Sequence, residues 1–185
     1  LGGKTTTVGT PMRPAILAAA AVPFASPEPN GPLRLLVVGG SQGARVMSDI
    51  VPDTIERLEP VLWSRLVLTQ QVREEDMARV RAIYDRLKIN AELAPFFGDL
   101  PARLASSHLV ISRSGAGTVA ELAAIGRPSL LVPLPEFTPA HLAAEILAFP
   151  AEPARLTAMA AAARKVGRLD AAERLADLVM KVAGI

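Results

Sequence analysis

Two glycine-rich turns are the segments of this sequence best suited to bind a phosphorylated ligand. Residues 39–44 (GGSQGA) and 114–118 (SGAGT) each follow an apolar, strand-like run and open a helix-like one. Backbone N–H groups at a helix N-terminus lack partners and carry partial positive charge, and glycine removes the Cβ atoms that would hold a phosphate at a distance. Two such turns in one chain predict one pocket for a nucleotide diphosphate.

A carboxylate follows the second turn. Glu121 lies one helical turn further along, on the face that carries Gly117 or Thr118, where it could accept both hydroxyl hydrogens of a ribose. The same spacing from Thr118 to Glu121 fits a helix capping box, in which both side chains bind backbone N–H groups, and spacing alone favours capping. Both interpretations stay open here.

The first turn matches a dinucleotide-binding fingerprint only in part. Its glycine spacing is G-G-x-x-G rather than G-x-G-x-x-G, and residues 69–71 (TQQ) supply no acid at the end of the next strand to bind an NAD ribose. An NAD-binding domain is therefore disfavoured. A tight strand-to-helix connection that binds no ligand is the other interpretation of this turn.

Two further side chains are candidates for the same pocket. Phe97 follows a short strand and precedes a helix, so it could pack against a base, although an aromatic residue at such a place is more often core. Arg13 lies in the proline-bounded segment 9–14 (GTPMRP) and could donate two hydrogen bonds to a phosphate. An isolated arginine is otherwise an ordinary surface charge.

Composition excludes several other functions. The 185 residues carry a net charge of +2 without a basic run, so nucleic-acid binding has no support, and the absence of cysteine excludes disulfides and thiolate metal sites. His108 and His141 are isolated in the sequence, and we expect structural or solvated roles and no metal site. No apolar run reaches the ~20 residues that span a bilayer.

The order of apolar and amphipathic segments predicts the fold. After residue 32, runs that are apolar on both faces alternate with helical patterns, which indicates an α/β domain with a parallel sheet covered on both sides, Rossmann-like and doubly wound. Both glycine turns then fall at the carboxyl ends of strands, where ligands of such sheets bind. The predicted strands are 33–38, 65–69, 91–94, 109–112 and 129–132, and the predicted helices are 15–21, 44–58, 74–87, 100–106 and 118–125.

The two ends of the chain differ from this pattern. Residues 1–31 form a predicted interdomain lead-in segment before the domain of residues 32–185. From residue 136 the pattern is helical, and we expect these helices to close the edge of the sheet, the last of them opening with a capping box at Asp170: they are 138–148, 153–165 and 170–182. Because strand residues 129–132 run almost directly into a new helix, we expect residues to be missing near 135/136.

Four segments together resemble a known family, although none is specific alone. They are 9–14 (GTPMRP), 37–45 (VVGGSQGAR), 97–100 (FGDL) and 112–122 (SRSGAGTVAEL). Their order and spacing resemble the donor-binding half of the MurG family, bacterial N-acetylglucosaminyltransferases that convert lipid I to lipid II in peptidoglycan synthesis. Departures at Thr10, Met12 and Gly117, where the family commonly has asparagine, valine and leucine, are mild.

The resemblance implies one half of a GT-B glycosyltransferase that is inverting and needs neither metal nor cofactor. Such an enzyme is peripheral at the cytoplasmic face of the inner membrane and transfers GlcNAc from UDP-GlcNAc to the C4 hydroxyl of lipid-linked MurNAc-pentapeptide. The family's N-terminal acceptor half, which contacts lipid I and the membrane, has no counterpart here, so no catalytic base is nominated. The family's sugar-contacting segment is missing too, at the join near 135/136.

The resemblance also implies roles for individual residues. Arg13 and Ser41 would contact the diphosphate, Ala116 to Thr118 would wrap the phosphates, Phe97 would lie at the uracil, and Glu121 would hold the ribose hydroxyls. The full set of UDP-GlcNAc-binding residues so implied is Arg13, Ser41, Gln42, Phe97, Ala116, Gly117, Thr118, Val119, Ala120 and Glu121. Two alternatives remain: the donor-binding subunit of a split transferase, which the lead-in segment disfavours, and a nucleotide-sugar-binding module without catalytic activity.

Overall fold

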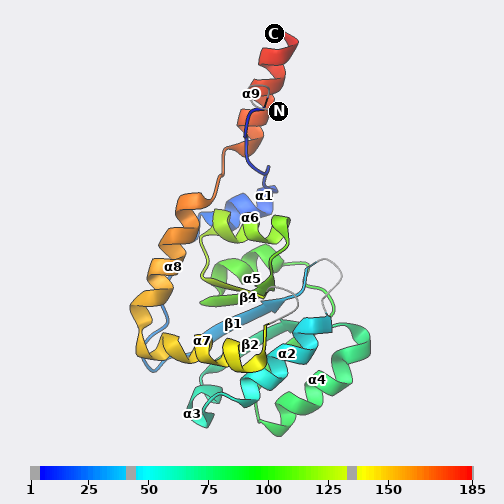
Figure 1. Ribbon diagram of the computed structural model, residues 1–185, viewed down its shortest axis with the longest axis vertical. Coiled ribbons are helices and arrows are strands. Elements are labelled where there is room, and N and C mark those ends of the chain that lie inside the picture. The colour runs from blue at the N-terminus through cyan, green and yellow to red at the C-terminus, as the bar shows by residue number, and fades with distance from the viewer. Residues whose placement is uncertain (1–4, 41–44, 133–136, 185) are drawn as a thin grey trace.

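The computed structural model describes residues 5–40, 45–132 and 137–184 and is built around a parallel sheet (Figure 1). Its five strands lie in the order β3-β2-β1-β4-β5, so the chain starts at the centre and crosses over to either side. This is the doubly wound α/β arrangement predicted from the sequence. The strands are β1 Leu33–Val38, β2 Leu66–Gln71, β3 Ala91–Ala94, β4 Leu109–Arg113 and β5 Ser129–Val132.

Helices cover both faces of the sheet. One layer contains α2, α4 and α7, and the other contains α1, α5 and α6 (Figure 1). The helices among the described residues are α1 Pro14–Ala20, α2 Arg45–Glu56, α3 Pro60–Trp63, α4 Glu74–Arg86, α5 Leu100–Ser106, α6 Ala116–Ile125, α7 Pro139–Ala151, α8 Pro153–Val166 and α9 Ala171–Ala183.

Alternation along β1 divides the core in two. Leu35 and Val37 point into the larger cluster, which includes Val51 of α2, whereas Leu36 and Val38 point into a smaller cluster with Leu122 of α6. Successive strand residues face opposite sides, so a strand that is apolar throughout must be covered twice. The sheet is therefore packed between two helix layers, and a site can form at the carboxyl ends of its strands.

The second glycine turn begins a helix earlier than predicted. Helix α6 starts at Ala116 with Gly115 as its N-cap residue, no side chain caps it, and Thr118 lies inside the first turn. The capping-box interpretation of Thr118 and Glu121 is therefore wrong. The predicted end is confirmed, because Gly126 takes a left-handed conformation with φ of 71°.

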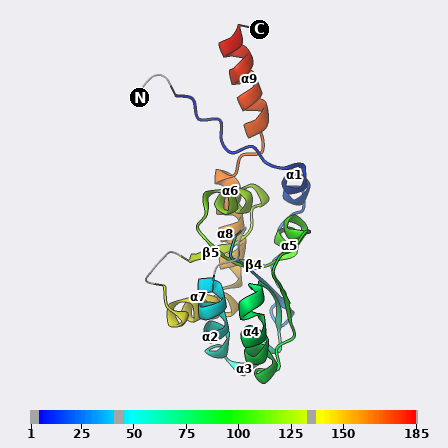
Figure 2. The ribbon, with the colours of Figure 1, turned by 90° about the vertical axis from the view of Figure 1, so that its right-hand side faces the viewer.

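The C-terminal helices only partly close the sheet. Helix α7 packs on α2, and α8 contacts both α6 and α7, so it joins the two helix layers. Helix α9, however, projects away from the sheet beside the N-terminal segment (Figure 2), which contradicts the prediction for this helix. Asp170 is its N-cap residue but makes no side-chain capping bond, so that capping box is wrong as well.

Candidate functional site

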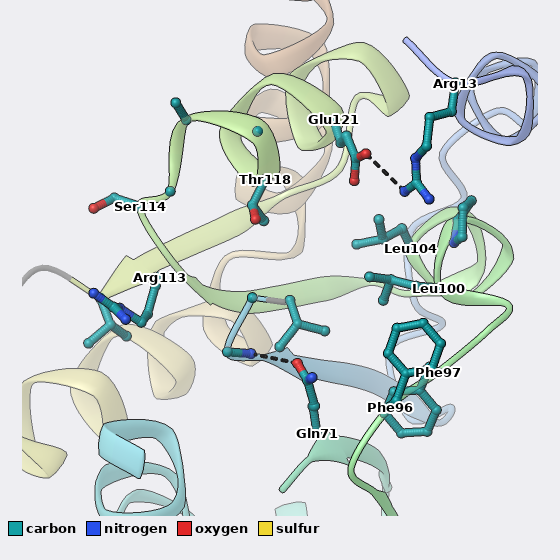
Figure 3. A pocket seen from close by; sticks show the side chains of 18 of the residues that line it. Arg13, Gln71, Phe96, Phe97, Leu100, Leu104, Arg113, Ser114, Thr118 and Glu121 are labelled. Carbon is teal, nitrogen blue, oxygen red and sulfur yellow. Dashed lines mark hydrogen bonds and ion pairs between the residues drawn. The ribbon is translucent and has the colours of Figure 1, made fainter. Parts of the chain in front are cut away.

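A cavity of about 790 Å³ opens at the carboxyl ends of β1 and β4 (Figure 3). Its volume lies in the range of small-molecule sites, and its place is where open α/β sheets bind ligands. The lining residues are Arg13, Val38, Gly39, Gly40, Gln71, Arg73, Phe96, Phe97, Gly98, Leu100, Pro101, Leu104, Arg113, Ser114, Gly115, Ala116, Gly117, Thr118, Glu121 and Val132.

The first turn of α6 forms one wall of this cavity. The first bond within the helix runs from the Val119 N–H to the Gly115 carbonyl, 2.9 Å. The N–H groups of Ala116, Gly117 and Thr118 precede that bond and have no carbonyl of the helix to bind. A Cβ atom built on Gly117 meets no heavy atom within 4 Å, so the space in front of the turn is open. An anionic group fits there, facing the positive end of the helix.

Arg13 and Glu121 meet across the mouth of the cavity (Figure 3). The Arg13 guanidinium, at the N-cap position of α1, donates to the Glu121 carboxylate at 2.9 Å, and their side chains are 61% and 22% exposed. An exposed ion pair of this kind contributes little to stability, so either partner can turn to a ligand at small cost. The structure thus brings together the two predicted residues that lie furthest apart in the sequence.

The two neighbouring phenylalanines differ in exposure. Phe97, the predicted residue, is 7% exposed, and the Arg103 guanidinium lies 4.4 Å from the centre of its ring. Phe96 is 71% exposed and also lines the cavity. Sequence reasoning missed Phe96, although two adjacent aromatic residues after a strand indicate that one of them points outward.

Arg103 is itself fixed by carboxylates. It donates two hydrogen bonds to Glu92 and one to Asp99. The bond to Glu92, followed by the bond to Asp99, raises the pKa of Arg103, and the reciprocal bond lowers the pKa of the Asp99 carboxyl. The guanidinium is therefore a fixed cation that holds the Phe97 ring in place.

Gln71 connects the first glycine turn to the aromatic loop, and sequence reasoning missed it. Its Oε1 atom accepts the Gly39 N–H at 3.1 Å, and its Nε2 atom donates to the Pro95 carbonyl at 3.0 Å. The side chain is buried at the end of β2, where an uncharged polar residue in an apolar strand was a detectable signal. It fixes the floor of the cavity relative to Phe96.

The charge of the lining favours an anion. Arg13, Arg73 and Arg113 stand against the single carboxylate of Glu121. Arg113 lies at the end of β4 and is exposed; it belongs to the segment that carried the family resemblance but was not singled out there. Arg13 is paired with Glu121 and Arg73 with Glu75, at 3.4 Å, so the three guanidinium groups leave one positive charge in excess, which favours a phosphate.

The other predicted residues lie elsewhere. Ser41 and Gln42 fall outside the described residues, and Val119 and Ala120 are not among the residues that line the cavity. Neither histidine lines it either. Within 5–40, 45–132 and 137–184, no three His, Cys, Asp or Glu residues are grouped so that they could hold a metal ion. Over the same part of the chain, we find no helix with the length and hydropathy to span a bilayer.

Fold and site together define a Rossmann-like α/β domain with a cavity at its switch point. The chain belongs to the family described as the glycosyltransferase family 28 C-terminal domain, which matches residues 34–142.

Curated relatives are closely similar to this chain. The UDP-N-acetylglucosamine--N-acetylmuramyl-(pentapeptide) pyrophosphoryl-undecaprenol N-acetylglucosamine transferase of Bradyrhizobium diazoefficiens is 72% identical over 211 residues, covering 100% of this chain and 58% of the relative. A transferase of the same name from Rhodopseudomonas palustris BisA53 is 70% identical, covering 100% of this chain and 56% of the relative.

The lengths of the matched segments differ. The chain spans little more than half the length of these relatives, whereas the match to the first of them extends over 211 residues against 185 in this chain. The relatives therefore contain residues that have no counterpart here. The predicted gap near 135/136 falls at residues outside the described ones and stays a prediction.

Solved structures share the fold. MurG from Acinetobacter baumannii superimposes with a TM-score of 0.74 at 24% identity, covering 85% of this chain and 55% of that one. UDP-GlcNAc 2-epimerase from Neisseria meningitidis, solved bound to UDP-GlcNAc, gives a TM-score of 0.59 at 14% identity, covering 82% and 44%. The fold prediction, one half of a GT-B architecture, agrees with the first of these likenesses.

Proposed function

We propose that this chain is the donor-binding half of a transferase that moves GlcNAc from UDP-GlcNAc to the C4 hydroxyl of undecaprenyl-pyrophosphoryl-MurNAc-pentapeptide. The observation that carries the proposal is the cavity over the first turn of α6, with Arg13 and Glu121 at its mouth. Relatives that are 70% and 72% identical over the whole chain have this transfer in their names. In this role the protein acts in peptidoglycan synthesis at the cytoplasmic face of the inner membrane, and so serves cell shape and division.

The diphosphate is proposed to lie against α6. The free N–H groups of residues 116–118 donate to its oxygens, and Arg13 and Arg113 bring positive charge to it from either side of the cavity. Charge develops on the departing UDP as the bond to the sugar breaks. Donors that are already in place stabilise that charge without rearrangement, which is the main electrostatic contribution an enzyme makes to such a step.

The nucleoside is proposed to lie between Glu121 and the aromatic loop. The Glu121 carboxylate accepts the ribose hydroxyl hydrogens once Arg13 leaves it for the phosphates. The exposed Phe96 ring offers a face for the uracil, while the backbone at the buried Phe97 reads the edge of the base. Binding therefore exchanges one exposed ion pair for several charge-assisted bonds to the ligand.

The acceptor side is proposed to come from a second half. The base that takes the proton from the acceptor hydroxyl, and the surface that meets the lipid and the membrane, belong to that half. It is part of the same polypeptide or, in the split-transferase alternative, a partner subunit. If no such half exists, the chain is a nucleotide-sugar-binding module.

Calorimetric titration tests the donor site. The intact protein, with both halves, is titrated with UDP-GlcNAc, UDP-GalNAc, UDP-glucose and NAD, and the UDP-GlcNAc titration is repeated with Arg13→Ala and Glu121→Ala. Glu56→Ala is the matched control, because Glu56 also forms an exposed ion pair, to Arg86 at 2.6 Å, and does not line the cavity.

We expect UDP-GlcNAc to bind selectively, both site variants to lose most of this affinity, and the control to keep it. Binding of NAD but no uridine nucleotide would contradict the proposal, and so would uridine nucleotide binding that neither site variant changes. After selective binding, a lipid I transfer assay on the protein that contains both halves separates a transferase from a binding module.

A further inference from the structure

One buried arginine lies at the end of the domain opposite the cavity. Arg127 is 1% exposed and, among the described residues, forms no ion pair with a carboxylate. All the hydrogen bonds recorded for its guanidinium go to backbone carbonyl groups. A buried cation with neutral partners alone is unusual, because removing a charge from water is costly.

The carbonyl groups that Arg127 binds belong to the ends of three helices. It donates to Val22 just after α1 at 3.0 Å, to Ala105 in the last turn of α5 at 2.6 Å, and to Gly126 at the end of α6 at 3.4 Å. The last carbonyl groups of a helix have no partner within it. The planar guanidinium of Arg127, with five N–H groups, therefore bridges the C-terminal ends of three helices at once.

A second arginine strengthens the same cluster. Arg164 of α8 donates twice to the Ala20 carbonyl of α1, at 2.7 Å for each bond, and once to the Ala124 carbonyl of α6 at 3.4 Å. Burial, and after it the charge of Arg164, lowers the pKa of Arg127. Arginine still stays protonated in proteins, and the partial negative charge at helix C-termini compensates both cations.

The same three helices form the cavity with their other ends. Arg13 stands at the start of α1, Leu100 and Pro101 begin α5, and Ala116 begins α6, and all of them line the cavity. Figure 1 shows α1, α5 and α6 together in one layer on the sheet. An arginine that fixes the far ends of these helices also fixes the directions in which their near ends point.

We propose that Arg127 is a positioning residue for the donor site: by joining the C-terminal ends of α1, α5 and α6, it holds Arg13, Glu121 and the first turn of α6 at the spacing that a nucleotide diphosphate needs. This inference rests on the proposed function.

The ligand makes this junction necessary. In the free protein, the Arg13–Glu121 pair ties α1 to α6 at the cavity. When phosphate takes Arg13 and ribose takes Glu121, that direct tie is lost. The hydrogen bonds of Arg127 and Arg164 then keep α1 and α6 in a fixed relative position while the ligand is bound. A misplacement of binding groups by about 1 Å can lower the rate of a reaction by ~100-fold, so the relative position of the two helices is important.

The test compares Arg127→Met and the milder Arg127→Lys with a matched control, Arg65→Met. Arg65 is half-buried and, like Arg127, donates to backbone carbonyls, those of Gly31 at 2.9 Å and Glu28 at 3.4 Å, but neither carbonyl belongs to a helix of the cavity. Two measurements are made on each protein at a temperature where circular dichroism shows it fully folded. They are the Kd for UDP-GlcNAc and the hydrogen exchange rates, without ligand, of the Val119 and Ala120 amides, the first two that are hydrogen-bonded within α6.

We expect Arg127→Met to raise the Kd about tenfold and to accelerate exchange at both amides, with an intermediate effect for Arg127→Lys, whose ammonium reaches fewer carbonyls. Arg65→Met lowers the melting temperature but leaves both readouts unchanged. If Arg127→Met is not folded, Arg127→Lys decides.

Wild-type affinity and amide exchange in a folded Arg127 variant would overturn the inference. So would equal effects from Arg65→Met, since these would indicate a general loss of stability. If the wild-type protein does not bind UDP-GlcNAc, the proposed function fails instead. The exchange rates then still decide whether Arg127 positions the first turn of α6.

Discussion

Helices α1 and α6 are joined at both ends, and the two junctions are built differently. At the cavity, Arg13 and Glu121 form one ion pair, with the arginine side chain 61% exposed. At the far end, Arg127 and Arg164 bind backbone carbonyls, and Arg127 is 1% exposed. The first junction is open to water and can exchange partners, whereas the second is centred on a guanidinium that is buried and cannot, with the exposed Arg164 beside it.

This difference shows how one pair of helices can be both adaptable and rigid. An exposed ion pair is worth little and is given up easily, so it suits a place where a ligand must enter. A buried guanidinium that leaves its carbonyl partners becomes a buried charge without hydrogen bonds, which is costly. It is therefore suited to a rigid contact. Substitutions at the two junctions are therefore expected to act differently, on stability at the buried end and on binding at the exposed end.

The largest effect is expected at the buried arginine of the far junction. Arg127→Met leaves several buried carbonyls without a donor, and we expect it to lower the free energy of unfolding by about 4 kcal/mol. Glu121→Ala at the open junction is expected to change it by less than about 1 kcal/mol. Urea denaturation of both variants measures the difference. Equal losses would remove the distinction between the two ends.

The far end of the sheet is also expected to be sensitive to acid. His108, before β4, is buried, its Nδ1 accepts the Arg34 N–H at 3.1 Å, and burial followed by the charge of Arg34 lowers its pKa to about 4. The unfolded chain, with a histidine pKa of about 6.5, binds the proton more readily, so stability is complete above pH 6.5 and falls as the pH drops towards 4.

Between pH 7 and pH 5 this histidine alone is expected to remove about 2 kcal/mol of stability. His108→Asn keeps an acceptor for the Arg34 N–H but does not titrate, so its free energy of unfolding should fall less over the same interval. Denaturation curves at both pH values measure this. Parallel losses in the two proteins would show that His108 carries no such penalty.

At the open junction, binding rather than stability is expected to change. Glu121→Gln retains the shape of the side chain but accepts hydroxyl hydrogens less strongly, so we expect the Kd for UDP-GlcNAc to rise about tenfold. A donor analogue without the ribose 2′-hydroxyl is the control, because the variant and the wild type should bind it more nearly alike. A tenfold loss that persists with this analogue would place Glu121 away from the ribose.

The parts of the fold that follow from local pattern were predictable. Strands β1, β3 and β5 have the predicted bounds, because short apolar runs bounded by Gly, Pro or polar residues leave few other readings. The glycine-rich pattern also correctly predicts that these turns follow the ends of strands β1 and β4. By contrast, α3 spans only Pro60–Trp63, too short for a periodic signal, and the direction of α9 depends on contacts rather than on its own sequence.

The site was predictable in its residues more than in its geometry. Arg13 and Glu121 were both identified, but their pairing across 108 positions of sequence is a tertiary contact. Which of Phe96 and Phe97 points outward depends on the twist of a loop. The role of Arg127 could not be predicted from the sequence. Its partners are backbone carbonyls up to 105 positions away, and every residue has a carbonyl, so no residue type marks them.

The smallest expected effect changes stability and binding in opposite directions at one residue. Gly117 lies in the first turn of α6 with open space where a Cβ would stand, so Gly117→Ala introduces no clash and removes the conformational freedom of glycine. We expect the free energy of unfolding to rise by about 0.5 kcal/mol. The new methyl group occupies the space proposed for the diphosphate, so the affinity for UDP-GlcNAc should fall. Urea denaturation and calorimetry of the same sample measure both, and a rise in affinity together with stability would show that the phosphates lie elsewhere.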